Sequence, residues 1–466
     1  MIVTHNAMGD PFITAPQTEF DQPDKSAVVD ALFYPWTLGV RPGGAVGIFR
    51  KGEVLHRKCY GFANLSTRAE IQPQSPFRLA SLTKPFVAMA IMILEERGLL
   101  KYDDQITNYL PGFSTARRSE ITLRHLLTHT SGVEDYEELF LRAGPIVYEP
   151  DLLETVELIA QHPLRFPPGD EWEYSNSGYV LLASIAERVS GVPLALFLRE
   201  EIFEPLGMLD TRLSEHAQPE AELSERAKGY TLKDGAYVEA DYSPLNAIYG
   251  PDGMYSTLDD MMKWCVVALG TERLVKSRTI EQAFTSGELN SGEPTGYGFG
   301  WFIGRNFGLP VVSHTGSWMG YRCFLSYYPS AELGVLVLGN FAEFDDVERS
   351  HVGCALSKLY LNLRPPTSDR VAPPREVHTH LTGRYELQDG EVFEIVSNEG
   401  SLWVNSTFSR TRLISASRLR FVVADAESDS YFFNEDINGK VNGVTRHLSL
   451  FGYSKDADAW ARKLNV

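Results

Sequence analysis

Strand patterns stand at two distant places in the chain, and a long helical region separates them. Residues 44–50 and the segment from Glu53 read as the two strands of a hairpin. Helical patterns broken by Gly- and Pro-containing loops run from Ser81 to about Leu269, and strand patterns return as a meander after residue 295. This order predicts one sheet that is completed by distant segments, with helices packed around it.

A proline-rich segment divides the chain. Residues 364–374 contain two Pro-Pro pairs, which make a stiff, extended linker. Residues 1–25 read as a polar lead-in, and residues 26–363 as the main domain. Residues 375–466 carry short alternating segments separated by Gly, Asn and Asp, a pattern typical of an antiparallel barrel or sandwich. We predict a small, lipocalin-like antiparallel β-barrel there.

Charge and composition restrict the partners. A net charge of −18 argues against nucleic acid and anionic membranes, because both attract clustered Lys and Arg. The longest apolar run, residues 86–94, is about half of what spans a bilayer. The first Lys or Arg is Lys25, so no secretory leader is visible, and we expect a cytoplasmic protein unless a leader has been removed. The cysteines lack C-x-x-C spacing, which predicts buried thiols; we expect neither a metal nor another cofactor.

The first candidate for chemistry is the Ser-x-x-Lys motif of Ser81 and Lys84, at the start of an apolar helix predicted over residues 85–97. As an N-cap residue, Ser81 would place its oxygen near the positive end of the helix dipole. Lys84 would lie on the same helix face, and burial would lower its pKa so that it could take the hydroxyl proton. The alternative is a capping serine followed by a solvated lysine.

Two further motifs offer partners for such a serine. Tyr174 and Asn176 lie two residues apart in an extended segment, so the phenol and the amide would face one cavity. The phenol could relay protons, and the amide could hold the lysine and a substrate carbonyl. In His314-Thr-Gly316, at the end of a predicted strand, the glycine would let a substrate backbone approach. The Ser317 amide could then join an oxyanion hole; a strand-end turn with an incidental histidine is the alternative.

Taken together, the order and the surroundings of these motifs resemble those of the serine β-lactamase and penicillin-binding-protein superfamily. The branch is that of class C β-lactamases, D-alanyl-D-alanine carboxypeptidases, D-aminopeptidases and related esterases. The resemblance covers about residues 40–355, with long matching blocks at residues 77–85, 121–133, 168–178 and 250–257. It implies an α+β fold in which helices flank an antiparallel sheet, with a largely helical second lobe and the site between the two.

The resemblance also implies a role for each motif residue. Ser81 would be the nucleophile, with Lys84 and Tyr174 as the proton-transfer pair and Asn176 as an orienting group. The amides of Ser81 and Ser317 would bind the oxyanion. The histidine-containing block at residues 121–133 is structural in the family, so we assign it no chemical role.

The chain departs from this family at His314, where enzymes that bind a substrate carboxylate usually place lysine. An imidazole, with an ordinary pKa of about 6.5, would hold a carboxylate less firmly. We therefore expect a hydrolase of small esters, amides or D-amino-acid peptides rather than a β-lactamase or a D-Ala-D-Ala carboxypeptidase. An acyltransferase and a catalytically inactive scaffold relative are the alternatives.

Three further expectations concern deacylation, the C-terminal domain and the oligomeric state. We assign no separate acid as the deacylating base, so Lys84 and Tyr174 are expected to act again on water. The C-terminal domain would either restrict substrate size, dock protomers or only pack, and a homo-oligomer is left open.

Overall fold

The computed structural model describes residues 24–114, 116–216, 223, 225–265, 271–344 and 346–362, followed by residues 381–387, 392–398, 401–405, 410–415, 420–423, 426–435, 441–447 and 458–463. The predicted linker at residues 364–374 lies outside these residues, as does nearly all of the predicted lead-in at residues 1–25.

A six-stranded antiparallel sheet lies at the centre of the larger part, in the order β10-β11-β12-β13-β1-β2. The early hairpin joins the late meander because β1 pairs with β13 along its whole length. The prediction of one sheet completed by distant segments is therefore confirmed. The strands are β1 (Gly44–Arg50), β2 (Glu53–Tyr60), β10 (Phe302–Asn306), β11 (Leu309–Trp318), β12 (Tyr321–Tyr328) and β13 (Leu333–Gly339).

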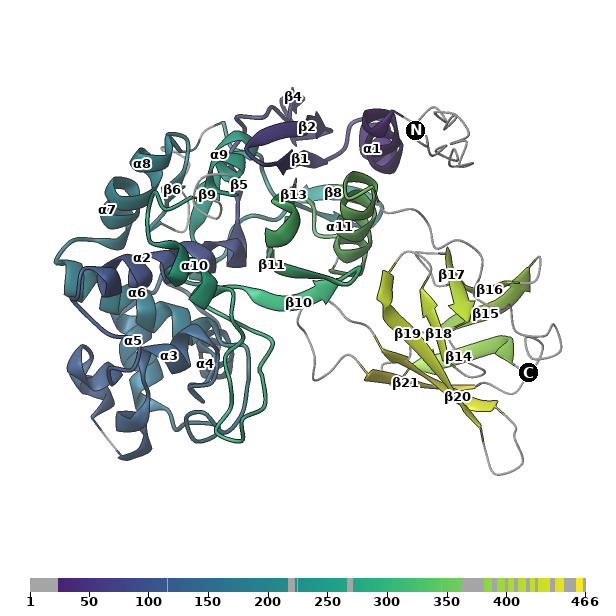
Figure 1. Cartoon of the computed structure of the whole chain (residues 1–466). Coiled ribbons are helices and arrows are strands. Elements are labelled where there is room, and N and C mark those ends of the chain that lie inside the picture. Colours follow the sequence, from purple (N-terminus) through teal and green to yellow (C-terminus); the bar gives the residue numbers. More distant parts are fainter. Residues whose placement is uncertain are drawn as a thin grey trace, which may run out of the picture.

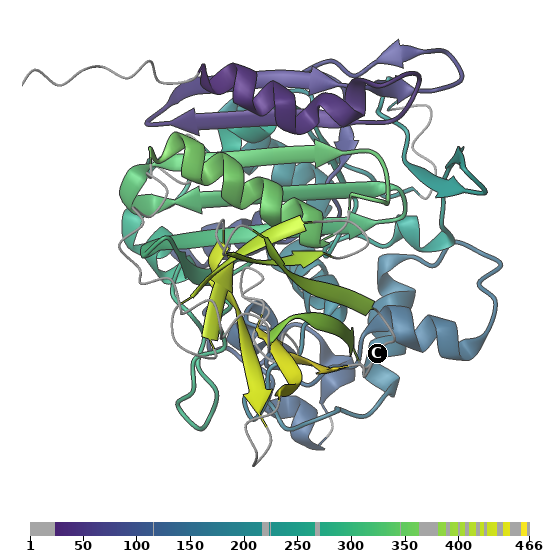
Figure 2. The same ribbon diagram turned by 90° about the vertical axis from the view of Figure 1, so that its right-hand side faces the viewer.

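Helices cover both faces of this sheet. Figure 2 shows α1 (Lys25–Phe33) and α11 (Asp346–Tyr360) side by side on one face. The residues of β13 alternate between two apolar clusters: Val335 and Val337 pack with α1 and α11, whereas Leu336 and Leu338 pack toward the helical lobe. Both faces of the strand are thus buried, as its continuous apolar sequence requires.

The helical lobe lies to the left of and below the sheet in Figure 1. The helices predicted at residues 85–97 and 179–189 are α2 and α6, which pack against each other. The lobe and its neighbours comprise α2 (Lys84–Glu96), α3 (Leu123–Leu127), α4 (Tyr136–Ala143), α5 (Leu152–Gln161), α6 (Asn176–Ser190), α7 (Leu194–Leu198), α8 (Glu204–Leu206), α9 (Leu258–Lys263) and α10 (Ser277–Ala283).

Three small sheets complete this part. The three-stranded sheet β5-β9-β6 borders the site described below, since β5 leads directly into the turn that carries Ser81. Its strands are β5 (Phe77–Arg78), β6 (Arg212–Leu213) and β9 (Met254–Ser256), and the two hairpins are β3 (Phe62–Asn64) with β4 (Ala69–Glu70) and β7 (Tyr230–Lys233) with β8 (Ala236–Glu239).

The C-terminal strands pair in sequence order, each antiparallel to the next. The first of them also pairs with the last, through Tyr385 and Lys463, so the ladder closes on itself. Its strand β19 contacts β10 of the central sheet, and Figure 1 shows the C-terminal strands beside β10 and α11. The strands are β14 (Gly383–Leu387), β15 (Val392–Asn398), β16 (Ser401–Asn405), β17 (Arg410–Ser415), β18 (Arg420–Val423), β19 (Ala426–Glu435), β20 (Val441–His447) and β21 (Asp458–Lys463).

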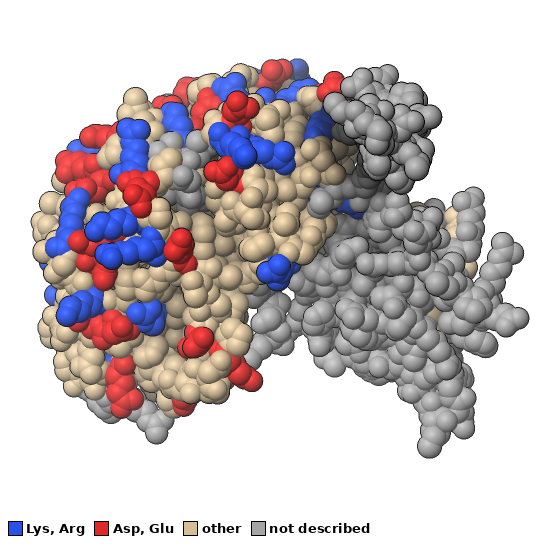
Figure 3. Space-filling view, viewed as in Figure 1, with Lys and Arg blue, Asp and Glu red and all other residues tan. Residues whose placement is uncertain are grey.

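The face in Figure 3 carries charges of both signs, and most of the thiols are buried. On the face in Figure 3, Lys and Arg side chains are interspersed with Asp and Glu. The four cysteines, all within the described residues, form no disulfide; Cys265, Cys323 and Cys354 are buried, as predicted, whereas Cys59 is half-buried.

No single helix in the described ranges has the length and apolar character to cross a membrane. One pair, Asn176–Ser190 with Leu194–Leu206, meets that length and composition test jointly and is bent by 78°.

Candidate active site

Ser81 lies in a 3₁₀ turn, η2 (Ala80–Thr83), between β5 and α2. Ala80 has a φ of 49°, in the left-handed region that residues with a Cβ rarely adopt. The N-cap residue of α2 is Thr83, so the prediction of Ser81 as N-cap is wrong. The reason is Pro85, which has no N–H for an α-helical bond to the Ser81 carbonyl; the Lys84 N–H donates to that carbonyl instead and closes a 3₁₀ turn.

Lys84 is fully buried and surrounded by oxygen atoms. Its Nζ lies 2.9 Å from Ser81 Oγ, and it donates to Asn176 Oδ1 at 2.8 Å and to the Pro251 carbonyl at 3.3 Å. Burial lowers the pKa of Lys84 to about 7, although nearby carboxylates act in the opposite direction. Near neutral pH a large fraction of this lysine is therefore an uncharged amine.

The segment that carries Tyr174 and Asn176 is held at the start of α6. Ser175 is the N-cap residue, and its N–H donates to His129 Nδ1 at 3.1 Å. The His129 ring packs 4.4 Å from the Tyr174 ring, centroid to centroid. The Asn176 N–H donates to Asp135 Oδ2 at 2.6 Å. His129, one of two histidines in the block at residues 121–133, thus has a structural contact, which helps to place the two motif side chains beside Lys84.

A cavity of about 190 Å³ opens over Ser81. The motif residues that line it are Ser81, Tyr174, Asn176 and Ser317, and the other lining residues are Ala80, Tyr136, Glu137, Pro251, Asp252, Thr315 and Trp318. The structure therefore brings together the serine of one segment, the phenol and the amide of a second, and Ser317 of a third.

Gly316 is a neighbour of the cavity rather than part of its lining. A Cβ at this position would lie 2.1 Å from the Leu79 carbonyl oxygen, two residues before Ser81. The sequence predicted that this glycine admits a substrate backbone, whereas the close approach in the structure is that of the chain's own Leu79. The glycine lets β11 pass against the turn that carries Ser81, so Ser317 can reach the same cavity.

His314 does not line the cavity, contrary to the predicted substrate-binding role. Its ring is buried, with Nδ1 2.6 Å from the Thr315 carbonyl oxygen and Nε2 3.0 Å from the Tyr297 hydroxyl oxygen. These partners suit a neutral ring that donates from Nδ1 to the carbonyl and accepts the Tyr297 hydroxyl at Nε2. Burial, followed by the charge of Lys84, lowers the pKa of His314 to about 3. The ring is thus a neutral part of the wall behind the cavity.

Two carboxylates of the cavity were missed by sequence reasoning. Glu137, in the first turn of α4, accepts a hydrogen bond from Asn176 Nδ2 at 3.0 Å. Burial, reinforced by Asp135, raises the pKa of Glu137 to about 7. The second carboxylate is Asp252. It lies within the matching block at residues 250–257, but nothing in the local pattern of either acid shows that it faces Ser81.

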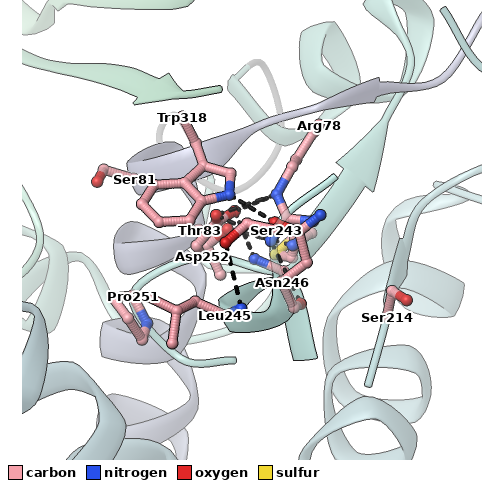
Figure 4. A network of polar contacts seen from close by, with 12 residues as sticks. Arg78, Ser81, Thr83, Ser214, Ser243, Leu245, Asn246, Pro251, Asp252 and Trp318 are labelled. Atoms are coloured by element: carbon pink, nitrogen blue, oxygen red, sulfur yellow. Dashed lines mark hydrogen bonds and ion pairs between the residues drawn. The ribbon is translucent and has the colours of Figure 1, made fainter. Parts of the chain in front are cut away.

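Asp252 belongs to a buried polar network. Its carboxylate lies 3.0 Å from Arg78, which also donates to the Tyr255 hydroxyl and the Asn246 carbonyl. The indole N–H of Trp318 donates to Asn246 Oδ1 at 2.6 Å. Figure 4 shows this network beside Ser81, and it fixes one wall of the cavity.

The chemistry available at this site is that of an alcohol, an amine and a phenol. Within the residues that the structure describes, no group of three or more His, Cys, Asp or Glu side chains is arranged to hold a metal ion. A hydroxyl next to a buried, partly neutral amine is the arrangement that activates a serine for attack on a carbonyl carbon.

Several known proteins are similar to this chain. The β-lactamase family model matches residues 35–352. Penicillin-binding protein 4* of Bacillus subtilis is 31% identical over 413 residues, covering 83% of this chain and 89% of that protein. Esterase EstB of Burkholderia gladioli is 30% identical over 357 residues, 68% of this chain and 90% of that protein. A D-aminopeptidase of Brucella anthropi is 28% identical over 336 residues, 71% of this chain and 61% of that protein.

The fold is shared with solved structures. The octameric penicillin-binding protein homologue from Pyrococcus abyssi superimposes with a TM-score of 0.65 at 24% identity, covering 95% of this chain and 100% of that chain. The predicted β-lactamase/transpeptidase-like arrangement of sheet and helices is thereby confirmed. The chain belongs to the β-lactamase family, within the serine β-lactamase and penicillin-binding-protein superfamily of serine hydrolases.

Proposed function

We propose that this protein is a serine hydrolase that acts through an acyl-enzyme on small esters, amides or D-amino-acid peptides. The observation that carries the proposal is the buried amine of Lys84, 2.9 Å from the hydroxyl oxygen of Ser81 and with its pKa lowered to about 7. A serine hydroxyl is a weak nucleophile until a neighbouring base takes its proton, and Lys84 is such a base in its neutral form.

The hydrogen bonds of Lys84 orient this base. A neutral amine has two N–H groups and one lone pair. The oxygens of Asn176 and Pro251 can accept the two N–H groups, which leaves the lone pair directed at the Ser81 hydroxyl. Asn176 is itself oriented, because its Nδ2 donates to Glu137 and its Oδ1 must therefore face the lysine.

The acylation of Ser81 then follows from this arrangement. Lys84 takes the proton as Ser81 Oγ bonds to the carbonyl carbon, and the amides of Ser81 and Ser317 hold the oxyanion. Tyr174 gives its proton to the leaving alcohol or amine as the bond to the carbonyl carbon breaks, and it regains a proton from the protonated Lys84. In deacylation, Lys84 and Tyr174 act again, now with water as the nucleophile.

The charges in the cavity favour a substrate that carries an ammonium group. Glu137 and Asp252 line the cavity, and Asp252 is already paired with Arg78. His314 is neutral and turned away, so it supplies no cation for a substrate carboxylate. We therefore rank D-amino-acid esters, amides and aminopeptides above penicillins and carboxypeptidase substrates, which are anionic. The D-aminopeptidase similarity supports the same ranking.

Intact-mass analysis after treatment with a fluorophosphonate tests the acyl-enzyme chemistry. We expect one adduct on Ser81 in the wild type and none in Ser81→Ala, with loss of esterase activity in that variant. A panel of D-amino-acid amides, uncharged esters and a cephalosporin then tests the ranking. Faster turnover of the cephalosporin would reverse the ranking, and transfer of the acyl group to an added alcohol or amine would indicate an acyltransferase. Activity that survives in Ser81→Ala would overturn the proposal.

For the C-terminal part, we propose a lipocalin-like barrel domain over residues 375–466, joined by a linker at residues 364–374 to a catalytic domain over residues 26–363. Its strand β19 contacts β10, next to the strand that carries Ser317, which supports a role at the mouth of the cleft. Deleting residues 375–466 should then raise the rate on large substrates relative to small ones, and an unchanged ratio would exclude that role.

The octameric homologue also suggests that this protein forms a homo-oligomer, which light scattering would test.

A further inference from the structure

A buried arginine contacts the strand that borders the candidate oxyanion site. Arg349 extends from α11 and is 1% exposed. Its Nη1 donates to the Gly316 carbonyl at 2.7 Å and to the Cys323 carbonyl at 3.0 Å, and its Nη2 donates to Ser317 Oγ at 2.7 Å. Gly316 and Cys323 are paired residues of β11 and β12. One guanidinium therefore ties both strands at the place where they meet the cavity.

One of these bonds, the one to the Gly316 carbonyl, is made to the peptide unit that also carries the Ser317 N–H. The Gly316 carbonyl and the Ser317 N–H belong to the same planar group, so fixing the oxygen fixes the direction of the hydrogen. A cationic donor on the carbonyl oxygen makes a strong, directional bond. It also polarises the peptide, which strengthens the N–H on the other side as a donor.

The opposite side of this peptide is constrained as well. The position of a Gly316 Cβ would be 2.1 Å from the Leu79 carbonyl oxygen, so the peptide is held against the segment that leads into Ser81. Arg349 holds the carbonyl of the peptide, and Leu79 leaves it little room to turn.

We propose that Arg349 is a positioning residue for acyl transfer: it holds the Gly316–Ser317 peptide with its N–H directed at the oxyanion. This inference rests on the proposed acyl-enzyme function, in which the Ser317 amide binds that oxyanion. Arg349 does not line the cavity, so it acts through the peptide and not by touching substrate.

The variants Arg349→Lys and Arg349→Met test this role. Lysine keeps the charge but loses the fork that reaches three oxygens, whereas methionine loses both. Because removal of a whole oxyanion donor costs about 10²–10³-fold in kcat, loosening one should lower kcat about 10–100-fold for Arg349→Met and less for Arg349→Lys. KM should stay within about threefold, and affinity for a boronic acid that mimics the tetrahedral intermediate should fall together with kcat.

Arg322→Met is the matched control. It removes a guanidinium from β12 that donates to the Met319 and Tyr321 carbonyls. We expect kcat and boronate affinity close to those of the wild type. Thermal unfolding of each variant separates a folding defect from a positioning effect, and if Arg349→Met does not fold, Arg349→Lys decides alone.

Fluorophosphonate labelling of Ser81 tests the proposed function separately from the role of Arg349. Absence of a Ser81 adduct in the wild type would overturn the proposed function itself. An adduct in the wild type, combined with folded Arg349 variants that keep wild-type kcat and boronate affinity, would overturn the positioning role and leave the function intact.

Discussion

The Nζ atom of Lys84 lies 4.7 Å from the centroid of the Tyr174 ring, so the lysine contacts the face of the tyrosine. A ring face attracts a cation, which partly offsets the burial that favours the neutral amine. Tyr174 therefore has two separable parts: a ring that contacts Lys84 and a hydroxyl that we propose as the proton relay.

Tyr174→Phe should separate these parts, because it removes the hydroxyl and keeps the ring. We expect kcat to fall at least about 100-fold, the lower range for loss of a general acid–base group. The pH midpoint set by Lys84 should change little, because the ring contact remains. Pre-steady-state kinetics on a chromogenic ester would show acylation and deacylation slowed together. Slow acylation with normal deacylation would contradict the reuse of Tyr174 on water.

The pH dependence should report the neutral form of Lys84. Its pKa of about 7 means that the amine is protonated, and unable to act as a base, at lower pH. The second-order rate of Ser81 acylation should therefore rise with pH through about 7 and fall tenfold for each unit below it. Glu137 has a pKa near the same value, so the two groups titrate as a coupled pair.

A charge change at Glu137 tests this assignment. Glu137→Gln removes a negative charge that raises the pKa of Lys84, so the midpoint should move to lower pH. If the rate no longer depends on pH in this variant, the titrating base is Glu137 and not the lysine. Glu138→Gln is the matched control, since Glu138 lies in the same helix turn, pairs with Arg165 and does not line the cavity.

Glu137→Gln should also change substrate preference. A hydrogen bond to a charged group contributes about 1.5–3 kcal/mol, so loss of the carboxylate should lower kcat/KM for a D-amino-acid amide about tenfold or more. An N-acetylated ester of the same amino acid lacks the ammonium group and should change less than about threefold. An equal loss for both substrates would show that Glu137 does not bind the ammonium group.

Much of the fold and part of the site could be predicted from local patterns. The hairpin at residues 44–60 and the meander after residue 295 predicted the joined sheet, because short apolar runs bounded by turn residues indicate buried strands. Ser81 and Lys84 are close in sequence, so their contact follows from one helical turn. The contact of Asn176 with Lys84 was suggested by the residue types and supported by the family resemblance, since no local rule spans that separation.

What the sequence could not show depends on tertiary contacts. His314 was expected to face substrate, and only the partners Tyr297 and Thr315 show that its ring is turned into the wall. The role of Glu137 depends on how α4 packs beside α6. Arg349 looks like an ordinary helix arginine until α11 is placed on the sheet. Each case needs the relative position of two distant elements, which residue patterns along one element do not contain.

The ion pair of Arg78 and Asp252 supports the cavity wall and should be costly to break. Their side chains are 1% and 12% exposed. Arg78→Met would leave the Asp252 carboxylate buried without its cation, so the free energy of unfolding should fall by about 3–5 kcal/mol. Urea denaturation followed by fluorescence measures this loss. Adding Asp252→Asn should restore part of the stability, because the buried charge is then removed as well. If the double variant is as unstable as Arg78→Met, the destabilisation comes from lost packing of the long arginine side chain rather than from the unpaired carboxylate.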